Sequence, residues 1–384
     1  MQPVVSRRAL RNTILALGLL ALGGCSMFSS SDPRYEPAEL TQYEARVGAN
    51  VRWSAAIGSG SGYGFAPAVQ GEAVYAATPN ALAKVDLVSG RVLWRTSPGI
   101  TLTAGPGSDG RTTAVVAHDG HVIAYDDSGK EKWRSRASSA VFVPPVVGNG
   151  VVVVRSTDYR IQAFDAETGE YRWDVQRPGP ALALKTSMQM RAIDGVIISG
   201  LPNGRLIIID ADSGAVQWEA PVSVSRGATD LERISDVVGA PQMAGSLLCG
   251  VTYQGRISCF DLSQGGRPAW DIPFSSHSGM TNDGRYGYVV DQRDDVHSID
   301  FADGSKVWVQ DALRNRKLAT PAVTPAAVAV ADLEGYVHFL SRSNGDLLGR
   351  LNVGGGTVLS PLVGTPAGVL VQTGNGNLVL VGVN

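Results

Sequence analysis

The sequence predicts an all-β protein, an eight-bladed β-propeller in which an N-terminal strand closes the last blade. The first observation is a repeated unit of aspartate, glycine and tryptophan, as in Asp86, Gly90 and Trp94. Successive units start at intervals of 40, 39, 45, 51, 39, 41 and 41 residues. Such a period is typical of one four-stranded propeller blade. The eight starting positions are Asp86, Asp126, Asp165, Asp210, Asp261, Asp300, Ser341 and Gly382.

A turn residue six positions before each start is the second observation. Apolar alternating runs lie on both sides of the turn, for example residues 151–154 and 161–164. Gly, Asn and Asp tolerate the positive φ of a tight hairpin, and seven of the eight residues are of these types. Tyr159 is the exception in this series. The eight residues are Asn80, Gly120, Tyr159, Gly204, Gly255, Asp294, Gly335 and Gly376.

The tryptophans are the third observation, and they indicate how the ring closes. All seven lie at or near the start of a predicted outer strand. Trp53 has no repeat before it, whereas the last unit, which starts at Gly382, lacks a fourth strand. Placing the Trp53 strand there closes the ring and removes free sheet edges. The count is therefore eight blades, with seven as the alternative if the degenerate unit at Ser341 were a cap.

Two consecutive connections between predicted blades are longer than the others. The intervals of 45 and 51 residues place the extra residues at 177–190 and 222–238, between an outer strand and the next inner strand. All connections of this kind emerge on one face of a propeller, so these two loops should form one patch. Long ordered loops on a rigid scaffold often carry function, with a tolerated insertion as the alternative. Leucines exposed beside charged residues favour a protein-binding surface.

The N-terminal residues have the pattern of an export signal. Arg7, Arg8 and Arg11 precede an apolar run over residues 13–22. This run is too short to span a bilayer core of about 30 Å as a helix, so it does not predict a transmembrane anchor. We predict a signal peptide over residues 1–24, exported by the Sec route, with a twin-arginine signal as the alternative.

The end of this signal resembles the lipobox of bacterial lipoproteins. Residues 22–25 are Leu-Gly-Gly-Cys, and the cysteine of a lipobox carries the lipid. Ser26 follows where Asp often marks retention at the inner membrane, so the resemblance implies the periplasmic face of a Gram-negative outer membrane. An ordinary secretory signal is the alternative. We predict lipidation at Cys25, a flexible tether over residues 25–48 and the propeller over residues 49–384.

Charge and cysteine content limit the remaining possibilities. The chain has 33 Lys and Arg against 35 Asp and Glu, a net charge of −2, whereas a broad nucleic-acid-binding surface needs clustered basic residues. Besides Cys25 there are two cysteines, Cys249 and Cys259, on neighbouring predicted strands. A disulfide and two buried thiols both remain open, because a one-residue change of register moves a side chain to the other face.

Residues that could carry catalysis or bind a metal fall on structural positions of the repeat. His118 and His121 flank a predicted hairpin turn, and other units have arginine at the His121 position. Asp291, Asp294 and Asp295 could suggest calcium, but they occupy the same turn of another unit. Because the aspartates that start the units recur in most blades, they suit a structural turn better than a catalytic pair. We therefore predict no catalytic residue, no metal site and no cofactor.

The repeat resembles the pyrroloquinoline-quinone-type propeller repeat, with its Ala-x-Asp-x-x-x-Gly-x-x-x-Trp core. Quinoprotein alcohol dehydrogenases share this repeat, but they use a vicinal cysteine pair, and this chain has no adjacent cysteines. The BamB family of outer-membrane protein assembly factors resembles the whole chain. Residues 227–237, Gly-Ala-Thr-Asp-Leu-Glu-Arg-Ile-Ser-Asp-Val, are similar to that family's Gly-Ser-Thr-Glu-Ile-Asp-Arg-Leu-Ser-Asp-Val. Residues 332–338, Asp-Leu-Glu-Gly-Tyr-Val-His, are similar to its Asp-Ser-Glu-Gly-Tyr-Leu-His.

The resemblance implies a non-enzymatic scaffold of the outer-membrane β-barrel assembly machinery, the BAM complex. Its partner would be BamA, whose periplasmic POTRA domains contact the two long loops. The propeller would either position BamA or present unfolded outer-membrane proteins to it. A periplasmic quinoprotein oxidoreductase is the alternative function, and a binder of an envelope polymer such as peptidoglycan is a third.

The resemblance also implies which residues bind BamA. The family's Leu-x-Leu-Arg motif falls on Leu182, Leu184 and Lys185, and its Arg-Leu-Ser-Asp-Val-Asp motif includes Arg233 and Asp236. Two positions depart from these motifs. Lysine at position 185 loses the bidentate hydrogen bonding of arginine, and valine at position 238 replaces the second aspartate.

Overall fold

The computed structural model describes residues 32–383 of a chain that divides into two compact units, residues 1–38 and 39–384. The predicted signal peptide, Cys25 and the start of the predicted tether lie outside the described residues. In the first unit, a short 3-10 helix, η1 (Pro33–Tyr35), carries an ion pair between Arg34 and Asp32 at 2.6 Å. Over residues 32–383, no helix is long and apolar enough to cross a membrane.

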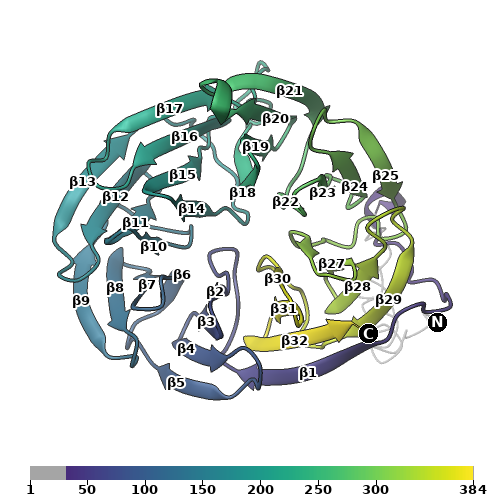
Figure 1. The fold of residues 1–384 in the computed structure, drawn as a ribbon, viewed down its shortest axis with the longest axis horizontal. Coiled ribbons are helices and arrows are strands. Elements are labelled where there is room, and N and C mark those ends of the chain that lie inside the picture. Colours follow the sequence, from purple (N-terminus) through teal and green to yellow (C-terminus); the bar gives the residue numbers. More distant parts are fainter. Residues whose placement is uncertain (1–31, 384) are drawn as a thin grey trace, which may run out of the picture. The chain divides into compact units, whose positions relative to one another are not determined.

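The second unit is a ring of eight four-stranded antiparallel sheets, which confirms the predicted eight-bladed propeller (Figure 1). In blades one to seven the strands follow chain order from the inner strand to the outer strand.

Blades one to four contain β2 (Ala68–Gln70), β3 (Ala73–Thr78), β4 (Ala81–Asp86) and β5 (Val92–Thr96); β6 (Leu102–Ser108), β7 (Thr112–Ala117), β8 (His121–Asp126) and β9 (Glu131–Arg136); β10 (Val146–Gly148), β11 (Val151–Arg155), β12 (Arg160–Asp165) and β13 (Tyr171–Gln176); and β14 (Met190–Ile193), β15 (Val196–Gly200), β16 (Arg205–Asp210) and β17 (Val216–Pro221). Blades five to eight contain β18 (Val237–Ala244), β19 (Leu247–Thr252), β20 (Gly255–Asp261), a 3-10 helix η2 (Leu262–Gln264) and β21 (Arg267–Phe274); β22 (Met280–Asn282), β23 (Tyr286–Val290), β24 (Val296–Asp300) and β25 (Lys306–Gln310); β26 (Ala322–Val323), β27 (Val328–Ala331), β28 (Tyr336–Leu340) and β29 (Leu347–Asn352); and β30 (Val363–Thr365), β31 (Gly368–Gln372), β32 (Asn377–Val383) and β1 (Ala49–Ala56).

The N-terminal strand closes the last blade, as the unpaired end of the repeat predicts. β1 pairs antiparallel with β32, and Trp53 stands opposite Leu380 in their register. The eighth sheet therefore has the order β1-β32-β31-β30, with β1 outermost (Figure 1). Because strands from both ends of the propeller share one sheet, the ring cannot open without breaking that sheet.

Each tryptophan joins its blade to the next, which explains why tryptophan and glycine recur together. The Trp53 indole Nε1 donates a hydrogen bond to the carbonyl oxygen of Leu87 at 2.9 Å. A Cβ atom at Gly90 would lie 2.5 Å from this indole, and Gly90 has a φ of +71°, so only glycine fits here. Equivalent bonds run from Trp94 to Asp127, Trp133 to Ala166, Trp173 to Ala211, Trp218 to Gly266, Trp270 to Phe301 and Trp308 to Arg342.

The hydrophobic core lies largely between neighbouring blades. One cluster contains Val153 and Ile161 from the third blade and Ile197 and Ile207 from the fourth, all at most 1% exposed. Burying an aliphatic side chain of this size contributes about 1.5–3 kcal/mol relative to leaving it in water. Because every blade shares such a layer with its neighbours, the ring is a rigid scaffold for the loops on its faces.

Most of the predicted hairpin turn residues adopt positive φ. Values run from 64° at Tyr159 and Asp294 to 91° at Gly376, and Gly120, Gly204 and Gly335 lie between them. In the fifth blade Gln254, with φ of 49°, takes this conformation instead of Gly255, and Asn80 does not adopt it. Tyr159 thus adopts the turn conformation although its residue type disfavours it.

The two cysteines of the propeller form a disulfide. Cys249 on β19 and Cys259 on β20 stand opposite each other in register, and both side chains are buried. The register therefore places both sulfur atoms on the same face of the sheet and decides between the two alternatives that the sequence left open.

Residues 39–48, which the sequence assigns to the tether, lie against the seventh blade. The Arg46 backbone N–H donates to the carbonyl oxygen of Leu348 at 2.7 Å. The Arg350 guanidinium lies 5.4 Å from the centroid of the Tyr43 ring. This part of the predicted tether is therefore held on the propeller instead of moving freely.

Candidate partner-binding surface

The two long loops lie side by side, as their positions in the repeat predict. Residues 177–189 connect β13 to β14, and residues 222–236 connect β17 to β18. Met188 forms a parallel bridge with Gly239, and the Gln189 N–H donates to the Gly239 carbonyl at 3.1 Å. We call these two loops together the loop surface.

The first loop presents the predicted leucines and lysine in different ways. Leu182 is 43% exposed at the surface. Leu184 is half-buried and packs against the cores on both sides of the loop. Lys185 is exposed, and its Nζ lies 5.3 Å from the centroid of the Phe142 ring, within cation–π range. An apolar side chain and a cation thus lie next to each other on an ordered backbone.

Asp236, which the resemblance implied as a partner contact, is completely buried. Its exposed fraction is 0%, and its Oδ2 accepts a hydrogen bond from the Leu184 backbone N–H at 2.6 Å. Burial raises the pKa of Asp236 to about 6, against the opposing effects of the Leu184 N–H and of Arg155. A partner cannot reach this carboxylate, so direct contact does not fit the structure. Asp236 instead links the two loops and positions Leu184.

A buried arginine lies beneath the loop surface. Arg155, the last residue of β11, is 6% exposed, and its guanidinium donates to the carbonyl oxygen of Gly200 and contacts Met188 Sδ at 2.8 Å. Burial lowers the pKa of Arg155 to about 10, while Asp236 has the opposite effect. Arg155 therefore remains protonated at neutral pH and contributes a positive charge below the loops. No sequence motif marks this position, so the sequence alone does not predict a role for it.

Arg233 is exposed but already stabilises its own loop. Its Nε donates to the Gly227 carbonyl at 3.1 Å, and its Nη2 donates to the Ala228 carbonyl at 3.2 Å. Glu232 accepts the backbone N–H of Ala228 at 2.8 Å. The charged residues of the second loop therefore hold its backbone in shape, and Arg233 keeps an exposed guanidinium edge.

Tyr159 explains why the first loop is ordered. Its hydroxyl donates to the Pro180 carbonyl at 2.6 Å. Its ring fills the space beside Gly179, where a Cβ atom would lie 1.9 Å from a ring carbon. The residue that did not fit the turn series by type is therefore the anchor of the long loop.

An apolar pocket of about 620 Å³ adjoins the loop surface. Leu184 lines it together with Tyr63 and Phe142, and both aromatic side chains are 40% exposed. These two residues lie in other connections, from blade eight to blade one and from blade two to blade three, so the lengths of the two long loops do not predict them. The available signal was an aromatic residue within a glycine-rich stretch, residues 58–64, and another just before Pro144 and Pro145.

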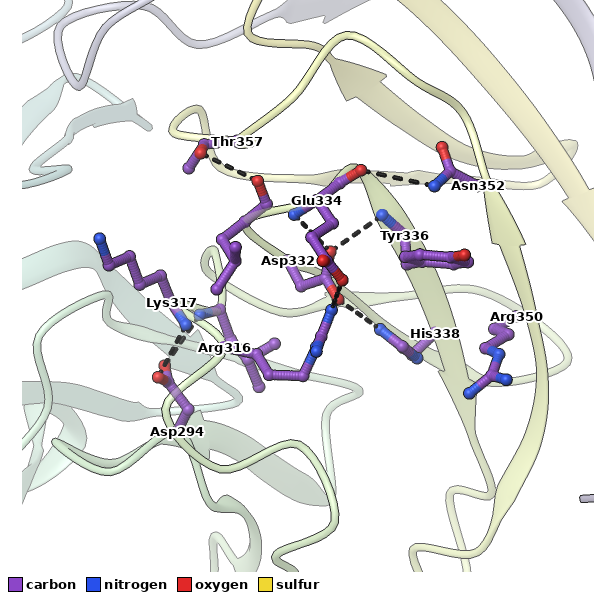
Figure 2. A network of polar contacts seen from close by, with 12 residues as sticks. Asp294, Arg316, Lys317, Asp332, Glu334, Tyr336, His338, Arg350, Asn352 and Thr357 are labelled. Carbon is purple, nitrogen blue, oxygen red and sulfur yellow. Dashed lines mark hydrogen bonds and ion pairs between the residues drawn. The ribbon is translucent and has the colours of Figure 1, made fainter. Parts of the chain in front are cut away.

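A buried network of ionisable groups lies in the seventh blade (Figure 2). Asp332 contacts Arg316 Nε at 2.7 Å and His338 Nε2 at 3.0 Å, and all three side chains are at most 4% exposed. Figure 2 shows that Arg316 extends to Asp332 from the connection between blades six and seven. In the same connection, the backbone N–H of Lys317 donates to Asp294 at 2.8 Å. A substrate cannot reach groups buried to this degree, so the network holds a connection against a blade.

The pKa values of this network reflect competition between burial and pairing. Burial favours the neutral form of Asp332, but hydrogen bonds from His338 and Arg316 outweigh it, and the pKa of Asp332 is lowered. For His338, burial outweighs the attraction of Asp332 and lowers the pKa. The stable arrangement is therefore an ionised aspartate between an arginine and a neutral histidine.

The aspartates that could suggest calcium are engaged by protein groups. Asp291, Asp295 and His297 bring ligand atoms within 4.8 Å of one another. Arg314 binds both oxygens of Asp295, at 2.9 and 2.6 Å, and His297 Nε2 contacts Asp291 at 3.1 Å. Asp294 accepts the backbone N–H groups of the next connection. These contacts give the aspartates a structural role in the turn.

Fold and surface together define the class of this protein: an eight-bladed β-propeller that presents two ordered loops beside an apolar pocket. A family model described as "Outer membrane protein assembly factor BamB" matches residues 78–310. The outer membrane protein assembly factor BamB of Bordetella pertussis is 59% identical over 378 residues, which cover 98% of each chain. The chain belongs to the BamB family of outer membrane protein assembly factors.

Solved structures show the same fold at low sequence identity. The crystal structure of BamB from Moraxella catarrhalis superposes with a TM-score of 0.79 at 21% identity, over 87% of this chain and 99% of that chain. A europium-containing methanol dehydrogenase gives a TM-score of 0.67 at 13% identity, over 87% of this chain and 93% of that chain. At such identities the likeness concerns the propeller architecture alone.

Proposed function

We propose that this chain is a non-enzymatic scaffold of the BAM complex that binds the POTRA domains of BamA through the loop surface. Family membership supports the assembly role, because the Bordetella relative is named an assembly factor and shares 59% of the sequence. In this role the propeller assists the insertion of β-barrel proteins into the outer membrane, by positioning BamA or by presenting unfolded barrel proteins to it.

One observation carries the choice of docking site: the loop surface holds its leucines in a fixed arrangement. Asp236 fixes the backbone of Leu184, and Leu182 projects from the same loop with 43% of its surface exposed. Lys185 adds a charge at the edge of this apolar patch. Protein interfaces concentrate binding energy in a few anchors of this kind surrounded by polar residues.

Alanine substitution of the anchors should weaken binding to BamA. With residues 26–384, which include every described residue, we expect Leu184→Ala to raise the Kd for the POTRA domains of BamA from the same organism at least about tenfold, or about 1.4 kcal/mol. Leu182→Ala should act in the same direction because it removes exposed apolar area from the contact. Titration calorimetry or biolayer interferometry measures the three affinities.

The matched control is Leu93→Ala. Leu93 is 42% exposed, which is close to the value for Leu182. It lies on β5, the outer strand of the first blade, whereas the loop surface leads into the inner strands of the fourth and fifth blades. Its substitution should leave the Kd within about twofold. Equal losses in all three variants, or tight binding that ignores both loop substitutions, would move the docking site elsewhere. A wild-type protein without measurable binding would overturn the proposal itself.

We further propose that a lipid on Cys25 anchors the chain to the periplasmic face of the outer membrane. A chain with several acyl groups should sediment with membranes, because burial of the acyl chains favours the bilayer. Cys25→Ala should move the protein into the soluble periplasmic fraction and abolish labelling by radioactive palmitate. Wild-type protein that takes up no label and stays soluble would contradict the anchor.

A further inference from the structure

A cavity of about 570 Å³ lies on the axis of the propeller, and the inner strands of all eight blades line it. It extends to the last residues of these strands, such as Gln70 of β2 and Ile193 of β14. The loop surface joins the ring at the opposite end, because its loops lead into the first residues of β14 and β18. The two cavities share no lining residue, although Gln189, the last residue of the first loop, lines this one.

One charged residue stands among the residues that line the cavity. Arg191 on β14 contributes a guanidinium, and no Asp, Glu, Lys or His shares the lining. The Arg191 Nε is buried without a hydrogen-bond partner in the described part of the chain. Burial lowers the pKa of Arg191, and no acidic neighbour opposes this effect. The half-buried Arg191 thus places a positive charge in the cavity, and no acidic residue of the lining compensates it.

Two other buried arginines of the propeller, unlike Arg191, have hydrogen-bond or ion-pair partners. Arg316 is paired with Asp332, and even Arg155 donates to a backbone carbonyl. Burying a charge without a partner is unfavourable, so proteins usually pair it or solvate it. The polar side chains of Gln189 and Thr281 line the same cavity and supply further hydrogen-bonding groups.

We propose that the axial cavity binds a small anion that carries a carboxylate or phosphate group, with Arg191 as its main contact. The planar guanidinium presents parallel N–H donors that match the two oxygens of such a group. The volume lies within the range of small-molecule sites. The anion supplies the negative charge that the residues lining the cavity lack. This inference is independent of the proposed docking to BamA.

The test uses residues 26–384 with inorganic phosphate and citrate as probes and sodium chloride at matched ionic strength as the reference. Titration calorimetry should show saturable binding of phosphate or citrate, and the arm that binds identifies the group. Arg191→Gln should raise that Kd at least about tenfold, because it removes the charge and the paired donors. The Kd of Arg191→Lys should lie between those of the wild type and of Arg191→Gln, because lysine keeps the positive charge but lacks the paired N–H donors of the guanidinium.

The control is Arg95→Gln, an exposed arginine on the outer strand β5, which should bind the anion as the wild type does. Circular dichroism of each variant shows whether the propeller is intact, and the lysine variant provides the comparison if the glutamine variant does not fold. The absence of saturable binding to both probes would overturn the proposal. Equal affinities of the Arg191 and Arg95 variants would also overturn it, because binding would then be nonspecific.

Discussion

Replacing Asp332 with alanine should lower the free energy of unfolding by about 3–5 kcal/mol, the usual cost of removing one partner of a buried ion pair. Asp332 and His338 are 0% exposed and Arg316 is 4% exposed in their side chains, so water cannot replace the lost contacts. The same carboxylate also accepts the backbone N–H groups of Glu334 and Tyr336, each at 2.9 Å. Urea denaturation followed by tryptophan fluorescence measures the change.

The control for this substitution is Asp86→Ala in the turn of the first blade. Asp86 also accepts a backbone N–H, from Ser89 at 2.7 Å, but water can reach its carboxylate. We expect a distinctly smaller loss of stability there. The loss of stability in Asp332→Asn should lie between those of Asp332→Ala and Asp86→Ala, since asparagine keeps an acceptor oxygen but loses the charge that faces Arg316. Similar effects of Asp332→Ala and Asp86→Ala would show that the buried network contributes no more than an ordinary turn.

The architecture was predictable because the same contact recurs in blade after blade. An indole that packs on the glycine of the next turn requires both residues at a fixed spacing, so the repeat in the sequence records the contact between blades. The vacancy after Gly382 and the unmatched Trp53 then determined the closing strand. The lengths of the connections likewise located the loop surface, because extra residues between two strands of known position must lie in the loop that joins those strands.

The chemistry of the surface was less predictable, because it depends on contacts between residues distant in sequence. Asp236 looks like a polar surface residue in its motif, and only the approach of the first loop buries it beneath Leu184. Tyr159 looked like a misfit because the turn position favours small residues, while its contact with Gly179 and Pro180 lies beyond the repeat. Arg191 lies on an inner strand, like many other residues of the chain. Whether an acidic residue faces it depends on the side chains that the seven other blades contribute to the axial cavity.

Asp236→Ala and Asp236→Asn should affect BamA binding to different degrees, because the carboxylate acts through Leu184. Alanine removes the acceptor of the Leu184 N–H, so the loop loses a defined position and the Kd should rise at least about tenfold, or about 1.4 kcal/mol. Asparagine keeps an acceptor oxygen of similar size, so its Kd should stay within about threefold of the wild-type value. Equal losses in the two variants would instead indicate that the negative charge itself contacts the partner.

The stability of these variants at different pH values gives a readout that does not depend on BamA. Because burial raises the pKa of Asp236 from 3.8 to about 6, the folded chain binds this proton more tightly than the unfolded chain. The contribution of Asp236 to stability is therefore fully present below pH 3.8 and falls as pH rises to about 6, by at most about 3 kcal/mol. The pKa of about 6 already includes the opposing effects of the Leu184 N–H and of Arg155. Asp236→Asn has no proton to lose, so the difference between its unfolding free energy and that of the wild type should grow in its favour from pH 4 to pH 7, as measured by urea denaturation. A difference that stays constant across this range would mean that Asp236 titrates near its ordinary value and that the loop leaves its carboxylate in contact with water.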